Sequence, residues 1–178
     1  MIIRPATTGD AAAVAAIYGH HVLEGLGTFE ETPPAAAEIA ARIAAVLTHG
    51  LPYLVAENAG AAAGFAYAAP FRPRAAYRFT VEDSVYVHPE RLGRGVGKAL
   101  VAEVIAACEG LGLRQMIAVI GDRGNAGSIG LHRSLGFVET GAGHALGFKH
   151  GRWVDVVWMQ RALNGGDATL PAGTGLRL

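Results

Sequence analysis

The stretch that decides the fold is Ser84-Val-Tyr-Val-His-Pro-Glu-Arg-Leu-Gly-Arg-Gly-Val-Gly-Lys98. It begins as a strand, continues as a glycine-rich turn and runs into a helix whose apolar residues are spaced three or four apart. Glycines let the backbone approach a ligand closely, and the first N–H groups of a helix are free to bind phosphate oxygens. The stretch therefore predicts a strand–turn–helix unit that binds a phosphate-bearing ligand.

The spacing within this turn excludes two common phosphate-binding motifs. A P-loop fails because Leu92 and Ala99 stand where it needs Gly and Ser or Thr. A dinucleotide fingerprint fails because Lys98 and Leu100 stand where its third glycine belongs. An ordinary turn before a helix stays open as the alternative.

Outward from the turn, the hydrophobic pattern predicts a mixture of strands and helices. Strands are expected at 2–4, 53–56, 63–69, 79–87 and 115–120, with two more from Phe137 around a turn at 147–151, and helices after Asp10, from Ala35, after Gly97 and over 125–134. Antiparallel hairpins come first and a strand–helix–strand crossover lies in the middle. This order is typical of an α+β domain covering residues 1–163, and the aperiodic segment 164–178 is expected to be a disordered tail.

Composition bounds the class of protein. The chain has 178 residues, of which 51% are hydrophobic and 17% charged, and this is a globular composition for one domain. Fifteen basic residues balance fifteen acidic ones, which argues against nucleic-acid or anionic-membrane binding. The single cysteine, Cys108, excludes an intrachain disulfide. No apolar run is long enough to span a membrane and no signal peptide is recognised, so a cytoplasmic location is expected.

The glycine turn resembles the acetyl-CoA motif of the GNAT family of N-acetyltransferases, which is Gln or Arg, two residues, Gly, any residue, then Gly or Ala. Gly95 and Gly97 match the small positions, and Leu92 at the first position is a departure. Residues 28–30, 80–87, 124–137 and 148–155 resemble the family's branch that acetylates phosphinothricin and methionine sulfone or sulfoximine. The resemblance extends over about residues 1–163.

The resemblance implies a GNAT fold, in which helices flank a mixed, mostly antiparallel sheet with a central strand–helix–strand unit. It also implies acetyl-CoA as co-substrate and a homodimer. The residues expected to bind acetyl-CoA are Val85, Tyr86, Val87, Gly93, Arg94, Gly95, Val96, Gly97, Lys98 and Asn125. Backbone N–H groups around 85–87 would polarise the thioester carbonyl. No metal is expected, because the histidines lack ligand spacing.

Two residues are candidates for acid–base chemistry. An amine near neutral pH is mostly ammonium and must lose a proton before it attacks a thioester, so a carboxylate is a suitable base. Glu82 lies in a strand, where glutamate is disfavoured, at the position of the family's proposed base. His132 occupies the place of the family's general acid. A solvent-facing Glu82 and a His132 that merely packs on Phe137 are the alternatives.

The acceptor is expected to be a small amino-acid-like amine. By resemblance its contacts fall on Arg72, Pro73, Arg74, Glu82, Asp83 and Ser84. Arginines before the Glu82 strand suit an acceptor carboxylate rather than a cationic acceptor. Acetylation of a protein N-terminus, a polyamine or another amine stays open, as does a non-catalytic acyl-CoA-binding module. Phe148, Trp153 and Trp158 are expected in the core or at a dimer interface.

Overall fold

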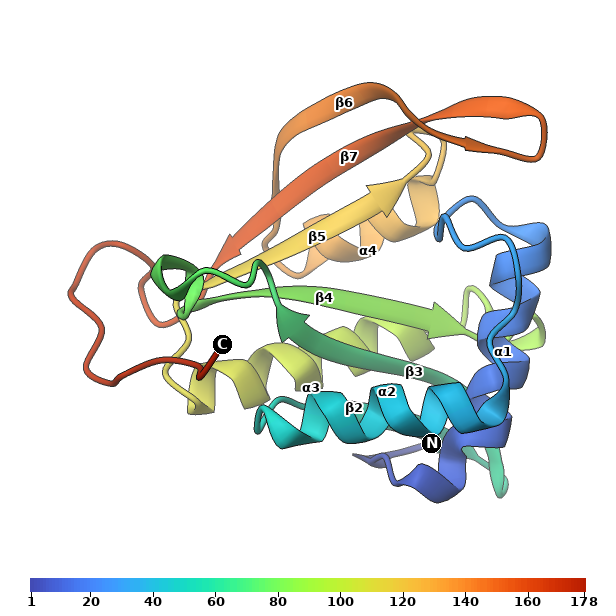
Figure 1. Ribbon diagram of the computed structural model, residues 1–178, viewed down its shortest axis with the longest axis horizontal. Coiled ribbons are helices and arrows are strands. Elements are labelled where there is room, and N and C mark those ends of the chain that lie inside the picture. The colour runs from blue at the N-terminus through green and yellow to red at the C-terminus, as the bar shows by residue number, and fades with distance from the viewer.

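Seven strands form one sheet in the computed structural model, which describes residues 1–178 (Figure 1). The strands are β1 (Ile2–Pro5), β2 (Tyr53–Asn58), β3 (Ala61–Pro70), β4 (Thr80–Val87), β5 (Gln115–Gly121), β6 (Val138–Lys149) and β7 (Arg152–Ala162). They lie in the order β1-β2-β3-β4-β5-β7-β6. Only β4 and β5 pair in parallel. The prediction of a mixed, mostly antiparallel sheet in an α+β fold is confirmed.

Four α-helices join these strands, namely α1 (Ala11–Glu24), α2 (Ala36–Thr48), α3 (Val96–Gly110) and α4 (Ala126–Ser134). Short 3-10 turns lie at Thr8–Asp10, Ala75–Tyr77 and Pro89–Arg91. The α3 helix is the crossover that lets β4 and β5 run in parallel, as such a connection requires. No helix combines the length and the apolar character that crossing a bilayer requires.

The helices cover both faces of the sheet, and β4 shows which helix lies on which face. The Tyr86 ring packs edge-on to Tyr18 of α1, with ring centroids 4.8 Å apart. A Cβ added at Gly97 of α3 would lie 3.3 Å from Val87 and 3.7 Å from Val85. Since alternate residues of a strand face opposite sides, even-numbered β4 residues face α1 and odd-numbered ones face α3 and α4.

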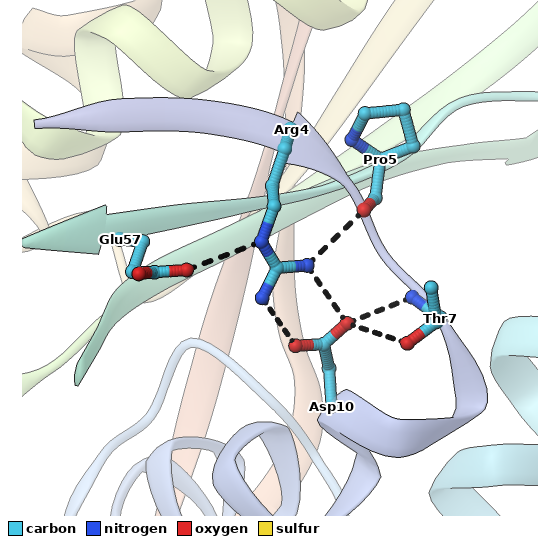
Figure 2. A network of polar contacts seen from close by, with 5 residues as sticks. All are labelled: Arg4, Pro5, Thr7, Asp10 and Glu57. Atoms are coloured by element: carbon cyan, nitrogen blue, oxygen red, sulfur yellow. Dashed lines mark hydrogen bonds and ion pairs between the residues drawn. The ribbon is translucent and has the colours of Figure 1, made fainter. Parts of the chain in front are cut away.

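A polar network fixes the first strand to the first helix (Figure 2). The Arg4 guanidinium donates to both carboxylate oxygens of Asp10, at 2.7 and 3.0 Å, and to Glu57 of β2 at 3.2 Å. Asp10 also accepts the Thr7 N–H at 2.8 Å, which satisfies a donor ahead of α1. These contacts lower the pKa of Asp10 from 3.8 to about 2, chiefly through the Arg4 hydrogen bonds. Folding therefore favours the ionised carboxylate here.

Several large apolar side chains lie at the surface. Leu47 and Leu111, at the C-terminal ends of α2 and α3, are 42% and 50% exposed. Phe148 and Trp153, at the tip of the β6–β7 hairpin, are 58% and 66% exposed. Figure 1 shows this hairpin projecting beyond the rest of the sheet. Neither aromatic residue belongs to this chain's own core.

The segment 164–178 forms no helix or strand but contacts the rest of the chain. Arg114 donates to the carbonyls of Gly166 and Thr169, both at 2.7 Å. The Leu176 N–H donates to the carbonyl of Arg78 at 2.8 Å. The interpretation of this segment as a disordered tail stays a prediction, and these contacts do not favour it.

Candidate functional site

The site lies where β4 and β5 part. The two strands pair only between Thr80–Asp83 and Gln115–Ala118, although β4 continues to Val87 and β5 to Gly121. A cavity of about 670 Å³ opens between the unpaired ends. Of the residues predicted to bind the cofactor, the cavity is lined by Val85, Tyr86, Val87, Gly93, Gly95, Val96, Gly97, Lys98 and Asn125. Ends of two parallel strands and the start of the intervening helix thus meet at one opening.

The glycine turn before α3 forms one end of this cavity. Gly93 and Gly95 have φ of +69° and +79°, a backbone conformation that other residues adopt only with strain. A Cβ added at either would have no atom within 4 Å, so the turn is open to a ligand. Gly95 caps α3 without a side-chain hydrogen bond, and the first turn holds no acidic residue. The first N–H groups of α3 are therefore available to an anion.

Side chains around the turn add positive charge. Lys98 and Arg91 line the cavity, whereas Arg94, predicted to bind the cofactor, is exposed and does not. Leu92, which departs from the family motif, also lines the cavity and is 57% exposed. Gly93, Gly95 and Gly97 of the turn can offer a ligand only backbone groups, and these do not depend on the side chain at position 92.

Glu82 and Ser84 lie on the face of β4 that is turned toward α1. Ser84 pairs with Tyr67 of β3, and Glu82 pairs with Ala69 on one side and with Ile117 of β5 on the other. Burial raises the pKa of the half-buried Glu82 carboxyl, and the positive charge of Arg72 partly offsets this. Glu82 does not itself line the cavity, whereas the next two residues of the strand, Asp83 and Ser84, do. A carboxylate with a raised pKa is suited to accept a proton.

His132 lies on the opposite face and is 3% exposed. Its Nε2 lies 3.0 Å from Oδ2 of Asp83 and its Nδ1 lies 2.8 Å from the Ser128 carbonyl oxygen. The ring also packs edge-on to Phe137, with centroids 5.0 Å apart. The predicted acid therefore lines the cavity, as does Asp83, but both of its ring nitrogens are engaged.

Asn125 caps α4, because its side-chain oxygen accepts the Ser128 N–H at 3.1 Å. Asn125 also lines the cavity. Capping and ligand binding are compatible, since the amide nitrogen is not used in the cap. The predicted contact with the cofactor's pantetheine arm stays a prediction.

The arginines before β4 do not act as one group. Arg72 lies with its guanidinium 4.4 Å from the centroid of the Phe71 ring. Arg78 instead bonds the Ala75 carbonyl, and its own carbonyl receives the C-terminal segment. Neither Arg72, Pro73 nor Arg74 lines the cavity between β4 and β5. Of these arginines, only Arg72 acts on Glu82 through its charge, which lowers the pKa of the carboxyl.

Sequence reasoning missed the end of α1 and the α1–α2 loop as a wall of the cavity. His21, Leu26 and Gly27 line it, and Nε2 of His21 donates to the Val87 carbonyl at 2.8 Å. A Cβ at Gly121 would lie 2.2 Å from the Leu26 carbonyl oxygen, so β5 and this loop touch. No local pattern reveals this packing, because Leu26 and Gly121 are about one hundred positions apart.

No group of three or more His, Cys, Asp or Glu side chains is placed to hold a metal ion.

Comparison with known proteins identifies relatives over nearly the whole chain. Residues 16–137 match the acetyltransferase (GNAT) family. A phosphinothricin N-acetyltransferase of Alcaligenes faecalis is 54% identical over 95% of this chain and 86% of its own. An L-methionine sulfoximine/L-methionine sulfone acetyltransferase of Salmonella typhimurium is 38% identical over 92% of this chain and 95% of its own.

Solved structures give the same result. A GNAT superfamily phosphinothricin acetyltransferase from Sinorhizobium meliloti, crystallised in complex with AcCoA, superposes with a TM-score of 0.94. It is 50% identical and covers 98% of this chain and 94% of its own.

Proposed function

The chain belongs to the acetyltransferase (GNAT) family, and we propose that it transfers the acetyl group of acetyl-CoA to the amine of a small amino-acid-like acceptor. It is an acyltransferase with acetyl-CoA as co-substrate. Phosphinothricin, methionine sulfone and methionine sulfoximine are the acceptor class that its relatives' names support.

The observation that carries the proposal is the continuous cavity from the glycine turn to the parted ends of β4 and β5. The turn is open at Gly93 and Gly95 and leads to helix N–H groups without an acidic neighbour, which fits the pyrophosphate of acetyl-CoA. Acetyl-CoA supplies the acetyl group as a thioester, which an amine attacks with release of the CoA thiol. The thioester end of acetyl-CoA would bind to backbone groups of Val85–Val87, on the edge of β4 that no longer pairs with β5.

Glu82 is the residue that we propose as the base. It would take a proton from the acceptor's ammonium group, and its raised pKa improves the match to that task. Direct attack needs no enzyme nucleophile, and Cys108 is unsuited to be one, since it is fully buried and burial raises its pKa to about 12. Backbone N–H groups on the parted edge of β4 would stabilise the charge that develops on the carbonyl oxygen.

Arg72 supports an acceptor with a carboxylate. Its positive charge acts on Glu82, so an acceptor whose amine approaches Glu82 has a guanidinium nearby for its acid group. A polyamine lacks that acid group and would bring further positive charge toward Arg72. We therefore rank acetylation of polyamines and lysine side chains below that of amino acids.

The proposal is tested by incubating the protein with acetyl-CoA and a panel of acceptors, and following thiol release together with the mass of the product. Phosphinothricin, methionine sulfone, methionine sulfoximine, common amino acids, spermidine and a lysine peptide form the panel. We expect acetylated product from the amino-acid analogues. Acetyl-CoA binding without product from any acceptor would instead favour a non-catalytic module.

We also propose that the chain forms a homodimer through the tip of the β6–β7 hairpin. Phe148 and Trp153 pack together there, with ring centroids 5.2 Å apart, while both remain largely exposed. Neighbouring Leu146 and Phe29 are also exposed, so the tip presents a clustered apolar surface. Light scattering should report a dimer for the wild type and a monomer for Trp153→Ala. Val138→Ala, an exposed apolar site elsewhere on β6, should leave the dimer intact.

A further inference from the structure

Asp83 and His132 form a buried pair that joins the sheet to α4. Their side chains are 1% and 4% exposed, and Oδ2 of Asp83 lies 3.0 Å from Nε2 of His132. The other ring nitrogen, Nδ1, lies 2.8 Å from the Ser128 carbonyl oxygen. This juxtaposition crosses 49 positions of sequence.

The Ser128 carbonyl fixes one ring proton of His132, and an ionised Asp83 would fix the other. A backbone carbonyl can only accept a hydrogen bond, so Nδ1 must carry a hydrogen to bond Ser128. An ionised carboxylate also only accepts, so Nε2 must carry a hydrogen to bond Asp83. With Asp83 ionised, the arrangement therefore fits a doubly protonated, positively charged imidazole.

The surroundings contain little else that would set this charge. α3 contributes Cys108, whose pKa is raised by burial and further by the Asp83 charge. β5 carries no titratable side chain, and Arg133 of α4 is exposed. Glu82 precedes Asp83 on the same strand but faces the other side. Burial alone lowers the pKa of His132, and the hydrogen bond and charge of Asp83 outweigh this so that the pKa is raised.

We propose that Asp83 is a positioning residue, which holds His132 doubly protonated and fixed in the cavity wall opposite the Glu82 face of β4. This inference rests on the proposed function and deepens it. Asp83 is then not a substrate contact, the role that resemblance gave it. Its Oδ1 is buried and has no hydrogen-bond partner in the chain.

The pair accounts for one proton of the reaction. In this proposal the Nε2–H of His132 exchanges its hydrogen bond to Asp83 for one to the sulfur, gives its proton to that sulfur as the carbon–sulfur bond breaks, and leaves His132 neutral. Of the two protons that the ammonium acceptor loses, one restores His132 through solvent and one is released. The proposal therefore needs no further co-reactant.

The first test is independent of activity. Nitrogen-detected NMR of the wild type should show His132 with both ring nitrogens protonated at pH 7, the signal being assigned with His132→Gln. In Asp83→Asn the titration midpoint of His132 should fall by about one pH unit or more, because the balancing charge is gone. A neutral His132 in the wild type, or an unchanged midpoint in Asp83→Asn, would overturn the proposal.

The second test uses the pH dependence of kcat/KM. Because the acid must be protonated, the fall on the basic side should move to lower pH in Asp83→Asn, while acetyl-CoA affinity by calorimetry stays within twofold. Asp155→Asn is the matched control, since Asp155 pairs with the exposed His144 at 2.9 Å and should move neither readout. A shifted midpoint with an unshifted pH profile would reduce Asp83 to a structural role. Wild type that acetylates no acceptor would refute the proposed function, while the NMR result would still stand.

Discussion

Glu82 and Asp83 are adjacent in sequence, yet their carboxylates lie on opposite faces of β4. Asp83 meets His132 of α4, whereas Glu82 faces the side covered by α1. The strand separates them at the point where it parts from β5. One face thus carries the proposed base and the other the proposed acid. Removal of a proton from the amine and delivery of a proton to the leaving sulfur are therefore assigned to opposite sides of one strand.

Replacing Glu82 with Gln should lower kcat/KM by about a hundredfold or more at neutral pH, the usual range for loss of a general base. The wild-type rate should fall as pH drops through the raised pKa of Glu82, and this part of the profile should disappear in the variant. Because burial disfavours the charged carboxyl, the variant should be at least as stable as the wild type. Exposed Glu103→Gln is the control, and equal pH profiles for the two variants would remove Glu82 from catalysis.

Replacing Gly95 with Ala should weaken acetyl-CoA binding at least tenfold by calorimetry, because a side chain at φ +79° forces the turn to rearrange. Gly112→Ala is the matched control. It has φ +73°, has no atom within 4 Å of an added Cβ, and follows the other end of the same helix outside the cavity. Both variants should lose about 1–2 kcal/mol of stability. Equal affinities would show that the turn before α3 does not hold the ligand.

Removing the Arg72 guanidinium, as Arg72→Ala, should raise the KM for a carboxylate-bearing acceptor about ten- to a hundredfold, the value of one charge-assisted contact. Loss of its positive charge should also move the acidic side of the pH profile to higher pH, since the charge of Arg72 lowers the pKa of Glu82. Arg78→Ala, whose side chain bonds the Ala75 carbonyl, should change neither. An unchanged KM in Arg72→Ala would separate the arginine from the acceptor.

Asp10→Asn should cost about 1–2 kcal/mol of unfolding free energy at pH 7, after allowance for solvent screening. Its folded pKa of about 2 lies below the unfolded value, so its stabilisation is present above about pH 4 and is lost as pH falls toward 2. Denaturant unfolding at pH 7 and pH 2 measures this. The deficit of the variant should shrink at pH 2, and exposed Asp167→Asn should show no deficit at either pH.

Local pattern was enough for the elements around the site. The turn at Gly93–Gly97 and the order of helices and strands follow from glycine spacing and hydrophobic period, and the structure has them within a few residues. The cap made by Asn125 is also local, since it spans three residues. Such features depend on contacts within one or two turns of chain.

Contacts between distant segments could not be read from the sequence. The Asp83–His132 pair depends on how α4 docks on β4, and the His21 bond to Val87 depends on how α1 docks on the other face. The three arginines of the β3–β4 connection looked like one cluster because they are close in sequence. The chain turns between Arg72 and Arg78, and the carbonyl of Arg78 accepts a hydrogen bond from the C-terminal segment instead.

The central claim is tested most directly by comparing kcat/KM for L-methionine sulfoximine and for its carboxamide, with thiol release measured at saturating acetyl-CoA. An enzyme that holds the acceptor's carboxylate beside Arg72 should prefer the free acid by about tenfold or more. Equal values for the acid and the amide, or spermidine acetylated as fast as the acid, would contradict this account of the acceptor.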